Sequence, residues 1–345
     1  MESLAALDLV WLGMLLKIAL VVIFFLTAPL AVGYMEHKVL AHMQARNGPM
    51  EAGIGPLKHG VGQLVADGIK FIQKEDIIPA AADRWVFALA PGVALVPVMV
   101  VLVAIPLGPG LFAENLNAGI FFALAVSSVS VIGILMAAWS SANKYSLMGG
   151  IRAAAQLIAY ELPLVLGAAA VVLQAGSLSL VDIVLAQEAY TVFGVPMWYV
   201  LPQALGFLLF FVSSLAELSR PPFDMPIADS ELIFGHMTEY TGLRYAFFML
   251  TEYAGMVTLS ALVTVLYLGG WNPLPGVALP EGVVGAVVGA GVTLGKIFLL
   301  TGVMVWFRAT FPRLREDQLQ RMSWLVLIPL AILNITVTAI AKVVG

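Results

Sequence analysis

Long apolar runs separated by short polar stretches dominate this chain. A bilayer core about 30 Å thick needs roughly 20 apolar residues of helix. About eight runs approach that length, at 9–34, 86–106, 118–140, 154–174, 197–217, 246–269, 283–307 and 323–344. The runs are continuous rather than alternating, which argues against a spanning β-barrel. Because backbone groups in lipid must be paired internally, the pattern predicts an all-α polytopic membrane protein. We expect about eight transmembrane helices in a single integral membrane domain, 1–345.

The polar stretches fall into two sets that differ in charge. Basic loops are expected at 35–85, 141–153, 218–245 and 308–322, and the 17 Lys and Arg residues all lie there except Lys17, Lys296 and Lys342. The loops between them hold no Lys or Arg. Cytoplasmic loops carry an excess of Lys and Arg, so we expect the basic loops on the cytoplasmic side and both termini outside. Lys17 and Lys342 can snorkel to the outer interface. Lys296 lies deep in the seventh run and is expected to face protein or water.

Composition narrows the class further. Of the 345 residues, 61% are hydrophobic and only 11% are charged, which excludes an ordinary soluble globule and a disordered chain. The chain has no cysteine, which excludes disulfides, thiolate metal sites and iron–sulfur ligation by this chain. The four histidines show no metal-ligand spacing. The N-terminus has no basic residue before Lys17, so its first apolar run predicts a genuine span rather than a cleaved signal peptide.

The long first basic loop contains an amphipathic segment. Apolar residues recur at helical spacing through 56–74, while charged residues occupy the other faces. This pattern predicts a helix lying on the membrane surface. Such a helix either rests on the bilayer or roofs a binding site for an amphiphile, and the pattern does not choose between the two.

Four carboxylates lie within or at the ends of the apolar runs, in the halves next to the basic loops. They are Glu36, Glu161, Glu217 and Glu252. Charged groups inside a membrane are costly and usually functional. One interpretation is a set of buried ion pairs that fix helix register, for example Glu217 with Arg220 at i+3. The other is a proton route, which we favour because these acids outnumber their local basic partners.

The third basic loop is also rich in acids, which is unusual for a cytoplasmic loop. Its segment 220–240 contains Asp224, Asp229, Glu231 and Glu239, with three prolines that interrupt any continuous helix. It predicts a docking surface or an ion-entry mouth. A merely solvated loop is the alternative, although Phe223, Phe234 and Tyr240 argue against it.

Long motifs in this order are similar to a known family. They are MEHKVLAHMQARNGP (35–49), LVADGIKFIQKED (64–76), WSSANKYSLMGGIRAAAQLIAYE (139–161), AELSRPPFDMPIADSELIFGHMTEY (216–240) and GGW (269–271). The chain resembles the H-subunit family of bacterial NADH:quinone oxidoreductase, the counterpart of mitochondrial subunit 1 in respiratory complex I. The resemblance runs through almost the whole chain.

The resemblance implies a role in a larger enzyme. Members form much of the ubiquinone or menaquinone chamber and begin the charged path, often called the E-channel, that couples quinone reduction to proton pumping. They hold no metal, flavin or other redox centre; FMN and iron–sulfur clusters are expected on partner subunits. Partners would be the quinone-module and iron–sulfur subunits of the hydrophilic arm at the cytoplasmic loops, small membrane-arm subunits laterally, and membrane lipid, but no nucleic acid. The location would be the bacterial plasma (inner) membrane.

The resemblance also implies site residues, carried over position by position. The quinone chamber would use Glu36, His37, Lys38, Arg46, Asp67, Phe223 and Asp224; the proton path would use Glu161, Glu217, Asp229, Glu231, Glu239 and Glu252; Arg152, Arg220 and Lys296 would be supporting charges. Several positions depart from the family pattern, among them Met50 in the first basic loop and Ser130 beside Ser128 in the third apolar run. His37 replaces a usual arginine, Ile227 replaces a usual acid, and Ser128 stands where some relatives have a glutamate.

Other functions stay open on the sequence alone. A homologous subunit of a membrane-bound hydrogenase, or of a complex fed by a reduced deazaflavin or ferredoxin, would share much of the pattern. A stand-alone ion transporter would predict internal repeats with paired broken helices, and the motifs show no repeat. A pure anchoring subunit leaves the clustered acids unexplained.

Overall fold

The computed structural model describes residues 2–53, 58–192, 195–227, 229–277 and 279–344. Within them the regular elements are helices, joined by turns and loops, and one small two-stranded hairpin. Seven helical segments in this part of the chain are long and apolar enough to cross a membrane. They are α1 (Glu2–Met43), α3 (Arg84–Val101), α4 with α5 (Gly119–Ser128, Ser130–Ser140), α6 (Lys144–Ala175), α10 (Gly242–Tyr267), α11 (Gly282–Thr310), and α12 (Glu316–Met322) continued through the π-helical turn Ser323–Leu327 into α13 (Ile328–Val344). The polytopic, helical class is thereby confirmed.

The fifth expected span is shorter than predicted. Instead of a helix over 197–217, the structure has α8 (Ala204–Glu217), which has 14 residues and is about 21 Å long at 1.5 Å per residue. Turns occupy 199–203. Pro202 disfavours helical geometry in the residue before it, so the helix begins only after this proline.

The first span is longer than predicted. The hydropathy pattern predicts a loop from residue 35, but α1 continues to Met43. Glu36, His37 and Lys38 therefore lie on the last turns of a helix rather than in a loop. The pattern misses this extension because these turns are polar, and helices extend beyond the apolar core when their ends reach water or protein.

The predicted amphipathic helix is present as α2 (Gln63–Gln73), but it begins later than expected, because residues 59–62 form turns. The part of the prediction at 56–57 lies outside the described residues. α2 packs against α1 and α10, and Gly33 lets Leu64 approach α1 closely, since a Cβ at Gly33 would be 3.0 Å from Leu64 Cδ1. Val65 and Ile69 remain exposed, as an amphipathic helix facing lipid or a ligand requires.

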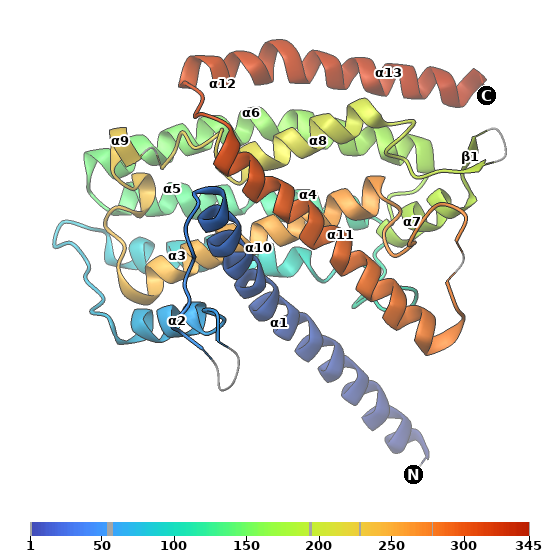
Figure 1. Cartoon of the computed structure of the whole chain (residues 1–345), viewed down its shortest axis with the longest axis horizontal. Helices are drawn as coiled ribbons and strands as arrows, with labels where there is room; N and C mark the ends of the chain where they lie inside the picture. The colour runs from blue at the N-terminus through green and yellow to red at the C-terminus, as the bar shows by residue number, and fades with distance from the viewer. Residues whose placement is uncertain (1, 54–57, 193–194, 228, 278, 345) are drawn as a thin grey trace.

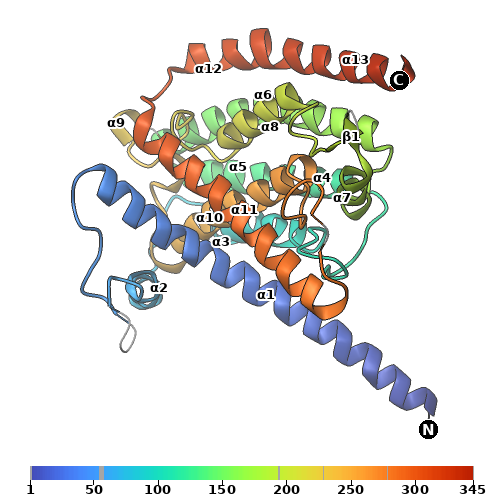
Figure 2. The same cartoon turned by 45° about the vertical axis from the view of Figure 1, so that its right-hand side comes forward.

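α10 lies at the centre of the bundle, with every residue from Ala254 to Tyr267 buried. Figure 1 shows α6 and α8 on one side of it, α11 crossing it, and α13 along the outer edge. The first half of α1 projects away from the other helices in both views (Figures 1 and 2). The short helices α2 and α9 (Asp229–Leu232) lie at one end of the bundle. α7 (Leu180–Ala189) and the hairpin β1–β2 (Thr191–Val192, Val195–Pro196) lie at the other.

The basic loops meet at the end that carries α2 and α9. Arg152 pairs with Glu231 over 2.7 Å, and Arg244 pairs with Asp76 over 3.3 Å, so each pair joins two different loops. The start of α1 and the end of α13 both lie toward the opposite end (Figure 1). This arrangement agrees with the segregation of charge along the sequence.

Candidate functional site

Four charged side chains from four segments form a cluster between the helices, with Arg308 at its exposed edge. Glu36 comes from α1, Arg220 from the turn after α8, Glu252 from α10 and Arg308 from α11. Arg220 Nη1 lies 2.7 Å from Glu36 Oε2, and these two side chains are only 3% and 2% exposed. Arg308 also contacts Glu36, and Arg220 Nε contacts Glu252. Two carboxylates and two guanidinium groups compensate one another, which is the condition for keeping buried charges.

The chain turns sharply after α8, and this turn directs Arg220 into the bundle. Ser219 has a positive φ of 52°, and the Arg220 N–H donates to Leu215 O over 3.3 Å. The guanidinium group also lies over the Tyr253 ring, 5.0 Å from its centre, where a cation–π contact is favourable. Arg220 thus sits between α1 and α10 rather than on the surface.

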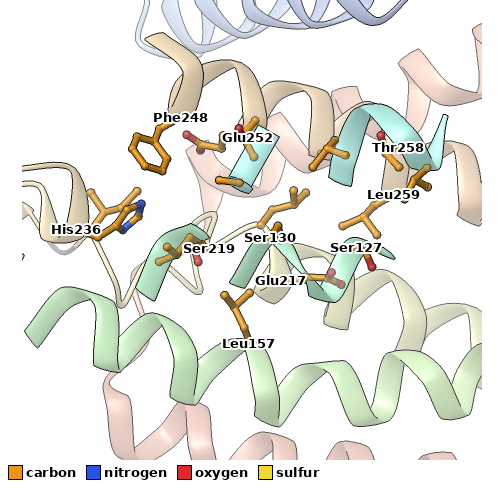
Figure 3. Close-up of a pocket in the computed structure, with 18 of the residues that line it drawn as sticks. Ser127, Ser130, Leu157, Glu217, Ser219, His236, Phe248, Glu252, Thr258 and Leu259 are labelled. Atoms are coloured by element: carbon orange, nitrogen blue, oxygen red, sulfur yellow. The ribbon is translucent and has the colours of Figure 1, made fainter. Parts of the chain in front are cut away.

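A partly enclosed cavity of about 110 Å³ adjoins this cluster. Apolar residues of α3, α6 and α10 form much of its wall, and the polar groups on it include Glu217, Glu252, His236, Ser127 and Ser130 (Figure 3). A site of this volume with several polar groups can hold several water molecules. Glu252 belongs to both the cavity wall and the ion-pair cluster, so it connects the two.

Glu217 and Glu161 form the second acidic part of the site. Glu217 Oε2 is buried and has no hydrogen-bond partner in the part of the chain that the structure describes. Glu161, on α6, lies close enough for the two carboxylates to repel each other, and Ser128 interacts with Glu161. Ser128 and the cavity-lining Ile227 are two of the positions that depart from the family pattern. Both departures therefore lie at this site.

A second charged cluster lies at the loop end of the bundle. Besides its pair with Arg152, Glu231 Oε1 lies 3.4 Å from Arg313, and Arg152 Nε lies 3.6 Å from Glu316. The hydrogen bond from Arg152 holds the pKa of the Glu231 carboxyl group below its ordinary value. These residues border an open hollow of about 760 Å³. The side chain of Asp229 lies outside the described residues. Glu239 is held nearby in the loop by Asn143, whose Nδ2 donates to Glu239 Oε1 over 2.5 Å.

The residues expected to form a quinone chamber make local contacts in the described part of the chain. Lys38 donates to Pro49 O over 2.6 Å, Arg46 to Gln44 Oε1 over 2.8 Å, and Lys70 to Asp67 Oδ1 over 3.4 Å. These residues lie on the end of α1, the following loop and α2, as does the half-buried His37.

Of the two expected chamber residues in the 220–240 loop, Phe223 packs against α6. The Phe223 ring packs against Tyr160 at 5.5 Å, and Gln156 donates to Phe223 O over 2.7 Å. Asp224 follows it and is half-buried. Phe223 also connects to the buried cluster, because its N–H donates to Arg220 O over 2.8 Å and the Arg220 side chain contacts Glu36.

Lys296 is not part of the acidic site. Its ammonium group donates to three backbone carbonyls, those of Leu268 (2.6 Å), Gly270 (2.9 Å) and Asn272 (2.5 Å). It also lies 4.2 Å from the centre of the Trp198 ring. These carbonyls follow the C-terminal end of α10, where a cation is favourable. Lys296 faces protein, as expected, but at the opposite end of the bundle from Glu36.

His236 and Arg308 belong to the site although little in the sequence points to them. Histidine is easily recognised as a metal ligand through its spacing, and His236 has no such spacing. Its burial beside the acids depends on the folded loop. Arg308 looks like an ordinary positive-inside residue in sequence. Among the described residues, no group of three or more His, Asp or Glu side chains is arranged to hold a metal ion.

Comparisons with known proteins agree with these observations. The family model described as NADH dehydrogenase matches residues 16–339. The H subunit of NADH-quinone oxidoreductase from Geobacillus thermodenitrificans is 44% identical over 333 residues, which cover 96% of this chain and 94% of that protein. The proteins of the same name from Anoxybacillus flavithermus and Bacillus mycoides are 46% and 45% identical, each over 89% of this chain and 87% of the relative.

Proposed function

This chain belongs to the NADH dehydrogenase family, and from that membership we propose that it forms the quinone-binding chamber of a proton-translocating NADH-quinone oxidoreductase. We further propose that it relays coupling to the proton pumps through its buried carboxylates. The observation that carries the proposal is the continuity between the Glu36–Arg220–Glu252–Arg308 cluster and the cavity that contains Glu217 and Glu252. Charged groups joined in this way inside a membrane domain are suited to moving protons.

The side of the bundle next to α2 supports the chamber part of the proposal. α2 lies beside α1 and α10 with exposed apolar residues. Tyr253 of α10 contacts Arg220 on one side, and its ring would lie 3.8 Å from a Cβ on Gly33 of α1. An amphiphilic quinone needs an apolar wall for its tail and hydrogen-bonding groups for its ring. The end of α1, α2 and α10 supply both, and subunits of the hydrophilic arm would complete the chamber.

The buried carboxylates support the second part of the proposal, the relay of coupling to the proton pumps. Arg220 and Arg308 compensate Glu36 and Glu252, whereas the charged group that acts on Glu217 is another acid, Glu161. A carboxyl group without a cation can hold a proton and pass it to water in the cavity. The route would run from the loop end, near Glu231 and Glu239, through the cavity to Glu217 and Glu161.

The proposal includes partners and orientation. The charged hollow around Arg152, Glu231 and Arg313 is suited to docking the quinone-module and iron–sulfur subunits, which would carry FMN and the iron–sulfur clusters. The loop end would face the cytoplasm, with both termini on the periplasmic side of the bacterial plasma membrane. Small membrane-arm subunits and lipid would cover the lateral apolar faces.

The test uses Glu161→Gln and Glu217→Gln in the assembled enzyme. We expect both variants to assemble normally and to lose most quinone reductase or proton-pumping activity, measured as NADH oxidation and as acidification of membrane vesicles. Glu281→Gln is the matched control, because Glu281 is an exposed acid at the opposite end of the bundle. Coupled activity equal to the unchanged enzyme in both Glu161→Gln and Glu217→Gln would contradict the proton-path assignment.

A further inference from the structure

A buried histidine forms part of the cavity wall and has no place in the proton path proposed above. The side chain of His236 is 7% exposed, and its Nδ1 atom is enclosed without a hydrogen-bond partner in the described part of the chain. It lines the cavity together with Glu217 and Glu252, and Figure 3 shows its ring at one end of the group of lining residues. Buried polar atoms in native proteins are nearly always satisfied, by protein or by ordered water. The cavity provides the space for such water.

The backbone around His236 is held in one position. Gly235 has a positive φ of 54°, and a Cβ there would collide with Pro226 O. On the α6 side, a Cβ at Gly149 would lie 2.9 Å from the His236 backbone nitrogen. Ser146 Oγ donates to His236 O over 3.3 Å. Only glycine fits at these two contacts, so the loop is fitted against α6 in a way that presents the imidazole to the cavity.

Burial, rather than a charged neighbour, determines the charge of His236. Phe248 packs edge-on against the ring at 5.5 Å, and the ionisable groups that share the cavity with it are Glu217 from α8 and Glu252 from α10. Glu252 is already paired with Arg220. Burial lowers the pKa of His236 to about 4, so at pH 7 only about one molecule in a thousand would carry the imidazolium form. His236 is therefore a poor carrier of protons but a good neutral hydrogen-bonding group, with one donor and one acceptor nitrogen.

We propose that His236 anchors water in this cavity, holding the first water molecule of a hydrogen-bonded chain that leads from the 220–240 loop to Glu252 and Glu217. The inference rests on the proposed proton path and adds a positioning residue to it. His236 neither gains nor loses a proton during turnover. It fixes one end of the water chain, so that a proton entering from the loop end meets aligned acceptors instead of disordered water.

The test compares two substitutions in the intact enzyme complex in its membrane. His236→Asn keeps a neutral side chain with one donor and one acceptor group, whereas His236→Leu fills a similar volume without either. We expect His236→Leu to lower NADH:quinone turnover roughly tenfold, which is less than the roughly 10²–10⁴-fold contribution of a group that itself transfers a proton. We also expect it to raise the solvent deuterium isotope effect on turnover. We expect His236→Asn to keep turnover within about twofold of the unchanged enzyme, with the same isotope effect.

Two activity results would overturn the inference. One is unchanged turnover and isotope effect in His236→Leu, because the water chain would then not need this anchor. The other is an equally large loss in His236→Asn, because the loss would then follow the imidazole itself or its packing. If the complex carrying His236→Leu is not recovered, His236→Met takes its place. Failure of both apolar variants to assemble, while His236→Asn assembles, would also overturn it by showing a structural role.

The test of His236 can fail without the test of the proton path failing, and the reverse also holds. Inactive Glu217→Gln together with fully active His236→Leu leaves the path standing and removes the anchor. Active Glu217→Gln and active Glu161→Gln remove the path itself.

Discussion

Arg220 donates a hydrogen bond to Glu36 over 2.7 Å, although 184 positions separate these residues in the chain. The contact joins the end of α1 to the turn after α8, and Glu252 shares the same guanidinium group. One buried cation therefore ties the acid of the expected quinone chamber to an acid of the expected proton path. A change in the charge of one acid alters the electrostatic energy of the other, because both interact with the same arginine.

Arg220→Gln should strongly destabilise the membrane domain. It removes the partner of two buried carboxylates, and breaking a buried pair costs about 3–5 kcal/mol because an uncompensated charge remains. We expect less assembled complex on native gels and a lower thermal midpoint for what assembles. Arg308→Gln is the control, since the Arg308 side chain is 40% exposed and Glu36 keeps Arg220. Equal stability of Arg220→Gln and the unchanged protein would contradict the cluster.

The sequence alone does not identify this pairing. At i+3, Glu217 and Arg220 look like neighbours on one helix face, and an ion pair between them is one interpretation of the pattern. α8 ends at Glu217, so the helical spacing no longer holds at Arg220. The chain turns there and sends Arg220 toward Glu36 and Glu252 instead. Short-range periodicity gives correct partners only while the helix continues.

Features that depend on long apolar runs and on local periodicity could be predicted. The seven long helices of the described residues follow from hydropathy, and α2 follows from its apolar spacing. The 14-residue length of α8 could not be predicted, because apolar residues continue through 197–203 and only Pro202 marks the later start.

The candidate site is predictable in part, for a similar reason. Carboxylates within apolar runs stand out in the sequence because a charge inside a membrane is costly. Glu36, Glu217 and Glu252 are found in this way, and the structure brings them to one connected site. Long-range contacts decide the rest. Lys296 is an intramembrane charge by the same criterion, yet it binds carbonyls at the other end, and His236 enters the cavity only because the 220–240 loop folds against α6.

Charge reversal of Asp229 together with Glu231, to lysine at both positions, should weaken quinone reduction or attachment of the hydrophilic arm. Arg152 and Arg313 both contact Glu231, so the change places like charges together at the loop end. The measurement is retention of NADH-oxidising subunits on washed membranes, with quinone reductase activity.

A charge-swap variant tests the Arg152–Glu231 ion pair. Arg152→Glu combined with Glu231→Arg exchanges the two charges and restores the pair in the opposite orientation. We expect partial recovery of attachment relative to Glu231→Arg alone. If the double lysine variant retains both the arm and the activity, the loop is only solvated and the docking proposal is wrong.

Lys296→Met should lower stability while sparing turnover in the complex that remains. The substitution leaves the carbonyls of Leu268, Gly270 and Asn272 without their donor. Each hydrogen bond to a charged group contributes about 1.5–3 kcal/mol, so the thermal midpoint should fall clearly. Lys342→Met is the control, because the exposed Lys342 reaches a single carbonyl, that of Gln174. Normal stability with lost proton pumping would instead place Lys296 in the coupling machinery.

The burial of His236 predicts an acid-sensitive contribution to stability. Its pKa falls from 6.5 to about 4 in the folded protein, so below pH 6.5 the unfolded chain binds a proton that the folded chain excludes. The folded state is therefore penalised increasingly as the pH falls from 6.5 to 4, by up to about 3 kcal/mol, and the penalty is absent above pH 6.5. We expect the thermal midpoint of the complex to drop between pH 7.5 and pH 5.

His236→Asn is the variant that assigns this drop to the histidine. It should reduce the drop, since asparagine does not titrate. Glu217 and Glu252 face the same cavity and are present in both proteins, so the comparison isolates the imidazole. Identical pH profiles for the two proteins would show that His236 is not kept neutral by burial, and would remove the physical basis for its role as a neutral anchor.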